Sequence, residues 1–387
     1  MMFKEETIAQ FRTFPTPFYY YDMDLLRETL SICNREAGRY GYFLHYALKA
    51  NSNPEILSLI SGSGYGADCV SGNEIRAAIR SGFKPAQIMF SGVGKSDDEI
   101  RLALQTKIQS INVESRQEME VIDGLAGAMG LKADISLRII PNVDAQTHRY
   151  ITTGLDENKF GILPWEFDKV MDKLKKLGNL RLKGLHFHIG SQITDLDIFK
   201  SLCHRVNEIN SWFISNQVFP EIINVGGGLG IDYGDPDKYR IPDFASYFRV
   251  FKDFIELQGG QQLHFEPGRA IVGQCGSLIT KVLFVKKGVN TRFAIVDAGM
   301  NDLIRPALYQ SYHKIENITS IEKPEKYDVV GPICESSDCF GKSITLPKTS
   351  RNDLLAIRSV GAYGQTMASQ YNLRDLAGTI YSDAVNL

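Results

Sequence analysis

The sequence predicts an α/β fold, in which a (β/α)8 TIM barrel is followed by a second domain that is rich in β-strands. Three observations point to this fold. Eight short apolar segments lie between residues 43 and 266, helical patterns separate most of them, and the region after Pro267 has strand-like alternation without a long helical pattern. Apolar strands separated by helices are typical of a parallel sheet. Eight such units in roughly 240 residues fit a closed barrel better than an open sheet.

The N-terminal segment, residues 1–24, is polar at first and then aromatic. Its aromatic run, residues 14–21, predicts an extended strand rather than a helix, because aromatic side chains suit a pleated surface. We expect this strand to join the β-rich domain.

The barrel is expected over residues 25–266. Its candidate strands are 43–48, 65–70, 87–92, 109–114, 134–140, 182–188, 221–226 and 262–266. The first four start at an even spacing of 22 residues, which is tight but sufficient for one strand and one helix. Helical patterns such as 73–80 and 117–122 lie between the strands.

The β-rich domain is expected to contain residues 1–24 and 267–387 and to contribute substrate-binding and dimer-interface residues. Turns that contain Gly, Pro or Asn separate its strand-like segments. These segments are 277–287, 292–297, 326–330, 343–346 and 354–359.

Composition excludes several classes of function. The 43 basic and 45 acidic residues give a net charge of −2, so nothing indicates a surface for nucleic acid or for an anionic membrane. The sequence has no run of 18 apolar residues and no apolar signal core at its N-terminus. Its six cysteines contain no Cys-x-x-Cys pair, which indicates reduced thiols and a cytoplasmic protein.

The ends of the predicted strands carry the candidate functional groups, because active sites of this fold lie at the C-terminal ends of barrel strands. Lys49 follows the first strand, where partial desolvation would lower its pKa and free its amine to attack a carbonyl. Asp68 and His188 end two further strands. Gly226–Gly228 and Glu266–Arg269 follow the last two, whose loops commonly form a phosphate site in this fold. Glycines let backbone N–H groups approach an anion closely.

A lysine, a phosphate site, a histidine and a carboxylate at one end of a barrel predict pyridoxal 5'-phosphate as the cofactor. Lys49 would bind it covalently, and the glycines would hold its phosphate. Glu266 would keep the pyridine nitrogen protonated, which makes the ring an electron sink suited to decarboxylation. His188 would lie flat against the ring.

A metal-dependent hydrolase on the same barrel is an alternative. His186 and His188 are two residues apart on a predicted strand, so they share a face, as metal ligands can. The strand ends offer no further histidine or carboxylate with ligand spacing. His186 also fits a structural role in the core better than His188 does.

Several motifs resemble those of the type III, alanine-racemase-fold decarboxylases that use pyridoxal phosphate. The motifs shared with this class are 46–51 (YALKAN), 186–192 (HFHIGSQ), 226–230 (GGGLG) and 266–269 (EPGR). Further stretches resemble the diaminopimelate decarboxylases, and the resemblance covers nearly the whole chain in order. These stretches are 152–154 (TTG), 159–161 (KFG), 297–309 (DAGMNDLIRPALY), 331–338 (GPICESSD) and 361–364 (GAYG).

This resemblance implies decarboxylation of meso-diaminopimelate to L-lysine by a homodimer with shared active sites. The implied cofactor-binding residues are Lys49, Asp68, His188, Ser191, Gly227, Gly228, Glu266, Gly268, Arg269 and Tyr363. The implied substrate-binding residues are Arg269, Arg305, Tyr309, Glu335 and Tyr363. Lys49, His188 and Cys334 are the implied catalytic residues. Cys334, which would protonate the carbanion, and Glu335, which would bind the distal ammonium, are expected to enter the neighbouring subunit's site.

Two other functions remain open. One is a related decarboxylase of another basic amino acid, ornithine, arginine or lysine. That enzyme would need an acidic residue where Arg305 offers a cation. The other is a non-catalytic carrier of pyridoxal phosphate, which would lack the β-rich segment 270–387.

Overall fold

The computed structural model describes residues 3–145 and 159–385. The chain forms two compact units. The barrel unit contains Leu30–Gly230 and Asp243–Gly268, and the β unit contains Met1–Thr29, Ile231–Pro242 and Arg269–Leu387. The predicted motif at 152–154 lies outside the described residues.

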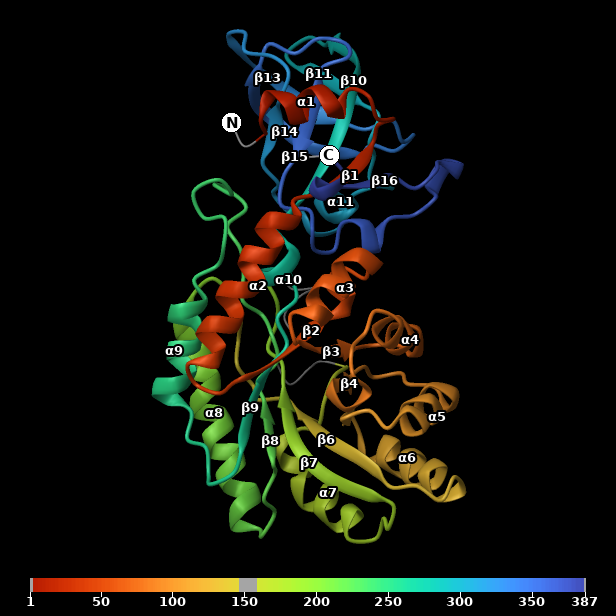
Figure 1. Ribbon diagram of the computed structural model, residues 1–387, viewed down its shortest axis with the longest axis vertical. Helices are drawn as coiled ribbons and strands as arrows, with labels where there is room; N and C mark the ends of the chain where they lie inside the picture. Colours follow the sequence, from red (N-terminus) through yellow and green to blue (C-terminus); the bar gives the residue numbers. More distant parts are fainter. Residues whose placement is uncertain (1–2, 146–158, 386–387) are drawn as a thin grey trace. The chain divides into compact units, whose positions relative to one another are not determined.

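The barrel unit is built on a closed barrel of eight parallel strands, which confirms the predicted fold class (Figure 1). Each observed strand lies within or next to a predicted one. The strands are β2 (Phe43–Ala47), β3 (Gly66–Cys69), β4 (Ile88–Phe90), β5 (Ser110–Val113), β6 (Ala133–Ile139), β7 (Leu180–Phe187), β8 (Ile222–Asn224) and β9 (Gln262–Phe265). The last strand pairs with the first, Phe43 with His264, which closes the ring.

In the part of the chain that the structure describes, eight helices accompany the barrel strands; α2 precedes the first strand, and each of the other seven follows a strand. They are α2 (Met23–Gly38), α3 (Pro54–Gly62), α4 (Gly72–Arg80), α5 (Asp97–Thr106), α6 (Arg116–Ala128), α7 (Phe167–Leu174), α8 (Leu196–Ser215) and α9 (Phe244–Phe254). Serine side chains fix where three of them begin. Ser71, Ser96 and Ser115 each accept a hydrogen bond from the backbone N–H three residues later, the usual N-cap contact.

The β unit contains an eight-stranded sheet, which confirms the predicted β-rich domain. Its strands are β1 (Phe18–Tyr21), β10 (Gly276–Lys287), β11 (Arg292–Val296), β12 (Ile315–Asn317), β13 (Pro324–Val330), β14 (Cys339–Pro347), β15 (Leu354–Ile357) and β16 (Gly378–Tyr381). As expected, the N-terminal strand β1 joins this sheet, where it pairs antiparallel with β10 and parallel with β16. The short helices of the unit are α1 (Glu5–Phe11), α10 (Arg269–Val272), α11 (Arg305–Tyr309) and α12 (Ser382–Val385).

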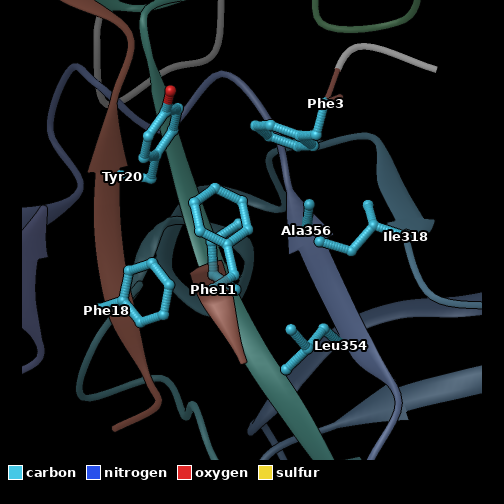
Figure 2. Packing of buried hydrophobic residues seen from close by; sticks show 8 residues of the cluster. Phe3, Phe11, Phe18, Tyr20, Ile318, Leu354 and Ala356 are labelled. Atoms are coloured by element: carbon cyan, nitrogen blue, oxygen red, sulfur yellow. The ribbon is translucent and has the colours of Figure 1, made fainter. Parts of the chain in front are cut away.

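Helix α1 is not predicted by the sequence, and its packing explains why it forms. Figure 2 shows aromatic rings of α1 and β1 in one buried cluster with side chains of the sheet. The rings of Phe11 and Tyr20 pack edge to face with their centroids 5.0 Å apart, and Phe3 lies 5.3 Å from Phe11. Complete burial of one such ring contributes about 1.5–3 kcal/mol. This contribution holds a seven-residue helix that would not be stable alone.

The six cysteines are all unpaired, and four of them are buried. Cys334 is the exposed one, and Cys339 is partly exposed. Within residues 3–145 and 159–385, no helix is long and apolar enough to cross a membrane.

Candidate active site

Lys49 lies just beyond the carboxyl end of β2, in a single 3-10 turn, Leu48–Ala50. The turn is fixed by the hydroxyl of Tyr46, which donates to the backbone oxygen of Asn51 over 2.9 Å. Leu48 and Ala50 are buried, while Lys49 is half-buried. The sequence therefore places one amine at the opening of the barrel, with a rigid backbone beneath it.

Four ionisable groups of the barrel unit have pKa values that the charge of Lys49 influences. These groups are Asp68, Glu74, His188 and Glu266. Their common response shows that the strand ends named in the sequence analysis converge around one lysine. Glu74, on α4, was not predicted; its carboxylate accepts the N–H of Val70 over 2.7 Å.

Asp68 is the buried end of a polar chain that crosses three strands. Its carboxylate accepts the hydroxyl of Ser91 over 2.8 Å, and that hydroxyl accepts the side-chain amide of Asn112 over 2.8 Å. Burial, followed by the charge of Glu266, raises the pKa of Asp68 to about 8. Asp68 and Glu266 therefore do not both carry a full charge at neutral pH.

Glu266 is the ionised member of this pair of carboxylates. Its two oxygens are bound by His186 Nε2 at 3.0 Å and by Asn224 Nδ2 at 2.7 Å. Burial alone would raise the pKa of Glu266, but the charges and hydrogen bonds around it, those of His186 first, lower it to about 2. The barrel thus holds a carboxylate that stays negative throughout the physiological range.

His188 follows β7 and lies beside the glycine loop. The N–H of Gly227 donates to its Nδ1 over 3.3 Å, so Nδ1 is an acceptor and the neutral ring carries its proton on Nε2. Burial, then the charges of Lys49 and Arg138, hold the pKa of His188 well below its usual value. The ring is therefore neutral at physiological pH.

Backbone conformation and close contacts require glycine in the loop after β8. Gly226 and Gly228 have φ of +71° and +112°, which favour glycine. At Gly227 a Cβ atom would lie 2.2 Å from the backbone oxygen of Glu266. At Gly268 it would meet the Cβ of Ala50 at 3.1 Å, which brings this loop against the turn of Lys49. The loop carries no side chains of its own here, so a phosphate could approach its backbone closely.

The remaining predicted residues lie in the β unit. Arg269 begins α10, and Arg305 begins α11; both are buried. Tyrosines surround the two guanidinium groups, whose carbons lie 4.9 Å and 5.9 Å from the ring centre of Tyr363. Arg305 also lies 5.6 Å from the ring of Tyr309, and Arg269 donates to the hydroxyl of Tyr233 over 2.5 Å. Tyr233 is a member of this cluster that the sequence analysis missed.

Arg305 is a buried cation whose charge no carboxylate balances within the part of the chain that the structure describes. None of the described ion pairs includes it, and its buried Nε has no hydrogen-bond partner there. Burial lowers the pKa of Arg305, the tyrosines raise it, and Arg269 lowers it further. Because an unpaired buried charge costs several kcal/mol, about the cost of a broken ion pair, this arrangement points to an anionic ligand.

Cys334 and Glu335 lie in the loop between β13 and β14, and both are exposed. The N–H of Cys334 donates to the side-chain oxygen of Asn372 over 3.3 Å. The hydroxyl of Ser337 donates to the carboxylate of Glu335 over 2.5 Å. Both residues are therefore held in place by their own unit, with their functional groups open to solvent.

The geometry does not favour the alternative reading of His186 and His188 as metal ligands. His186 turns its Nε2 to Glu266, and His188 accepts the N–H of Gly227, so each ring has a bond within the barrel. In residues 3–145 and 159–385, no three histidine, cysteine or acidic side chains form a group that could hold a metal ion. The barrel residues fit pyridoxal phosphate instead, with the amine of Lys49, a glycine loop that a phosphate can approach closely, a neutral imidazole and an ionised carboxylate.

Comparison with known proteins gives the class first. Residues 26–273 match the family described as "Pyridoxal-dependent decarboxylase, pyridoxal binding domain". A diaminopimelate decarboxylase of Bacteroides thetaiotaomicron is 58% identical over 377 residues, which cover 97% of this chain and 98% of that protein. The crystal structure of diaminopimelate decarboxylase from Helicobacter pylori, complexed with L-lysine, matches with a TM-score of 0.91 and 43% identity over 97% of this chain and 93% of that one.

The chain belongs to the pyridoxal-dependent decarboxylase family, and within it to the diaminopimelate decarboxylases. It is an enzyme that uses pyridoxal phosphate. A lysine/ornithine decarboxylase from Vibrio vulnificus, complexed with putrescine, shares the fold with a TM-score of 0.83 but only 21% identity over 97% of this chain and 96% of that one. That likeness shows the fold alone.

Proposed function

We propose that this protein decarboxylates meso-2,6-diaminopimelate to L-lysine and CO2. The structural observation that supports this substrate most directly is Arg305, a buried guanidinium with no carboxylate partner among the described residues. Diaminopimelate carries a second carboxylate far from the reacting carbon. A planar guanidinium binds such a group through two parallel hydrogen bonds.

The barrel residues would hold the cofactor. Lys49 would bind it covalently, while Asp68 would lie beside it. Ser191, Gly227, Gly228, Gly268 and Arg269 would surround its phosphate. His188 would stack on the ring, and Tyr363 would contact both cofactor and substrate. When bound, pyridoxal phosphate supplies an electron sink for the electron pair that the departing CO2 leaves behind.

The chain's own residues then direct the chemistry. Glu266, ionised and held by His186 and Asn224, would keep the ring nitrogen of the bound cofactor protonated. Arg305 and Tyr309 bind the distal carboxylate, and Glu335 binds the distal ammonium. The thiol of Cys334 delivers a proton to the carbon that has lost CO2.

Cys334 and Glu335 would serve the active site of a second copy, so the active unit would be a homodimer with shared sites. Their exposure in a single chain supports this assignment, since groups that act on substrate are otherwise shielded from water. We also propose that the enzyme works in the cytoplasm, in keeping with six unpaired cysteines.

The deciding assay is CO2 release from meso-diaminopimelate, with ornithine, arginine and lysine as controls. Diaminopimelate should be the preferred substrate by a wide margin. Preference for ornithine, arginine or lysine would instead support the related decarboxylase of a basic amino acid.

A further inference from the structure

Asp338 lies between two loops of the β unit that carry proposed substrate residues. We call residues 297–305 the arginine loop, because it ends at Arg305, and residues 331–337 the cysteine loop, because it contains Cys334. Asp338 is 4% exposed. One of its carboxylate oxygens accepts the N–H of Met300 over 2.7 Å, and the other accepts the N–H of Ile333 over 2.7 Å. A single side chain therefore bridges the two loops.

The two loops also touch backbone to backbone, at glycines. A Cβ atom on Gly331 would lie 2.4 Å and 2.5 Å from the two carboxylate oxygens of Asp338, and 2.7 Å from the backbone oxygen of Ala298. A Cβ atom on Gly299 would lie 2.8 Å from the side chain of Ile333. Neither glycine has a positive φ, so glycine is needed at these positions only because a side chain would not fit.

A third segment, residues 369–374, supports both loops. The N–H of Ser369 donates to the backbone oxygen of Asn301 in the arginine loop over 2.8 Å. In the cysteine loop, Asn372 accepts the N–H of Cys334, and Tyr371 forms a hydrogen bond with Glu335. These contacts connect residues 369–374 to each loop, whereas the carboxylate of Asp338 connects the two loops to each other.

Hydrogen bonds from backbone N–H groups to an ionised carboxylate are short and strong. The carboxylate of Asp338 uses both oxygens in this way, one for each loop. An amide of the same size has only one oxygen, and its NH2 end would face an N–H donor. One of the two bonds must therefore be lost in an asparagine variant, although the volume hardly changes.

We propose that Asp338 is a positioning residue, which couples the arginine loop to the cysteine loop. It thereby sets where Arg305 meets the substrate in its own chain's site and where Cys334 and Glu335 meet the substrate in the site of the second copy. The inference rests on the proposed function for the roles of those three residues. It adds a residue that touches neither substrate nor cofactor and acts on the substrate-binding residues through two backbone amides.

The test compares Asp338→Asn with Asp353→Asn in the cofactor-loaded enzyme. Asp353 is the matched control, because its carboxylate accepts the N–H of Ser350 over 2.8 Å in a turn without substrate residues. Hydrogen exchange followed by mass spectrometry should show faster exchange, by about tenfold or more, in peptides containing Met300 and Ile333. Asp338→Asn should cause this faster exchange, and Asp353→Asn should not.

Kinetics provide the second measurement. Asp338→Asn should lower kcat/KM for meso-diaminopimelate by about 10- to 100-fold and raise KM at least several-fold, because the substrate contacts lose their alignment. The visible absorbance of the bound cofactor should not change. A variant that merely loses folded protein would lower kcat and leave KM as it was.

Gly331→Ala is the second variant, since it should displace the same carboxylate without removing its charge, and the same pattern is expected. Unchanged exchange in both loops, or an unchanged KM in both variants, would overturn the inference.

Should the wild-type enzyme fail to act on diaminopimelate, the proposed function fails on its own. The exchange experiment would still decide whether Asp338 couples the loops.

Discussion

His186 and Glu266 form a buried pair inside the barrel, with His186 Nε2 3.0 Å from one carboxylate oxygen. They come from β7 and from the residue after β9, 80 positions apart in the sequence. The pairing, with Asn224 on the other oxygen, keeps Glu266 negative despite its burial. An ionised carboxylate suits the role proposed for Glu266, which is to keep the cofactor's pyridine nitrogen protonated.

Glu266→Gln should leave the fold intact, because the side chain keeps its size and can still accept one hydrogen bond. It should lower kcat by about 10²-fold or more, roughly 3 kcal/mol, because a neutral amide stabilises the ring proton less. The measurement is kcat at saturating diaminopimelate, with circular dichroism as the check on folding. A near-normal kcat would remove Glu266 from this role.

Lys49 should be the attachment point of the cofactor. The purified protein should be yellow, and borohydride reduction followed by peptide mapping should find the cofactor fixed on Lys49. Lys49→Ala should abolish both the colour and the activity. Recovery of the label on Lys95, whose amine is bound by Glu118 at 2.6 Å, or on any other lysine would show the site assignment to be wrong.

Shared active sites can be tested by mixing two inactive variants. Lys49→Ala and Cys334→Ala should each be inactive. Subunit exchange should restore up to about a quarter of the activity, because random pairing in a twofold dimer gives hybrids in which one site regains both groups. The control is each variant alone after the same treatment. No recovery after proven exchange would place both residues in the site of one chain.

Arg305 should determine the substrate. Arg305→Ala should lower kcat/KM for meso-diaminopimelate by roughly 3–5 kcal/mol, which is about 10²–10³-fold or more, as for breaking a buried ion pair. Arg305→Lys should restore little of this kcat/KM, because an ammonium cannot form two parallel hydrogen bonds with a carboxylate. The rate constants for diaminopimelate and ornithine in wild type and variant decide the point. Unchanged turnover of diaminopimelate would contradict the assignment.

Acid should destabilise the barrel through His45 and His264. Their rings are hydrogen-bonded at 2.8 Å, and burial, followed by the charge of His45, lowers the pKa of His264 to about 2. Burial also lowers the pKa of His45. Below the unfolded pKa of about 6.5, the unfolded chain binds protons that the folded chain does not. Stability should therefore be complete above pH 6.5 and fall below it by about 1.4 kcal/mol per pH unit for His264, with His45 acting in the same direction.

Urea unfolding at pH 7.5 and pH 5.5 measures this effect. His264→Gln should reduce the loss of stability between the two pH values. The control is His204→Gln, because His204 is exposed on α8. An equal loss in wild type and His264→Gln would contradict the assignment.

The barrel could be predicted from the sequence because most of its strand residues are buried on both faces, as in β3, β4 and β5, so that its strands are compact and largely apolar. Strands β12 and β16 could not be predicted. Each is short, Ile315–Asn317 and Gly378–Tyr381, and each forms through pairing with a distant neighbour, β15 or β1. Such pairing depends on tertiary contacts, which local alternation does not encode.

The candidate site follows the same division. Lys49, His188 and the glycine loops could be found because they end predicted strands. Ser91, Asn112 and Asn224 could not be assigned, since their partners lie on other strands and depend on the register of the barrel. One signal was present in the sequence: a polar residue inside an apolar strand, such as Asn112 or Asn224, must find a buried partner.

Strand β1 has a consequence for the order in which the protein is made. A ribosome synthesises Phe18–Tyr21 early, but both neighbours of this strand, β10 and β16, lie beyond the entire barrel in the sequence. All strands of the barrel can thus be synthesised while the aromatic strand β1 still has no strand to pair with. Its first neighbour, β10, is synthesised only after the last barrel strand, and its second neighbour, β16, only from residue 378 onwards. During that interval, the N-terminal strand is the segment that a chaperone would need to protect.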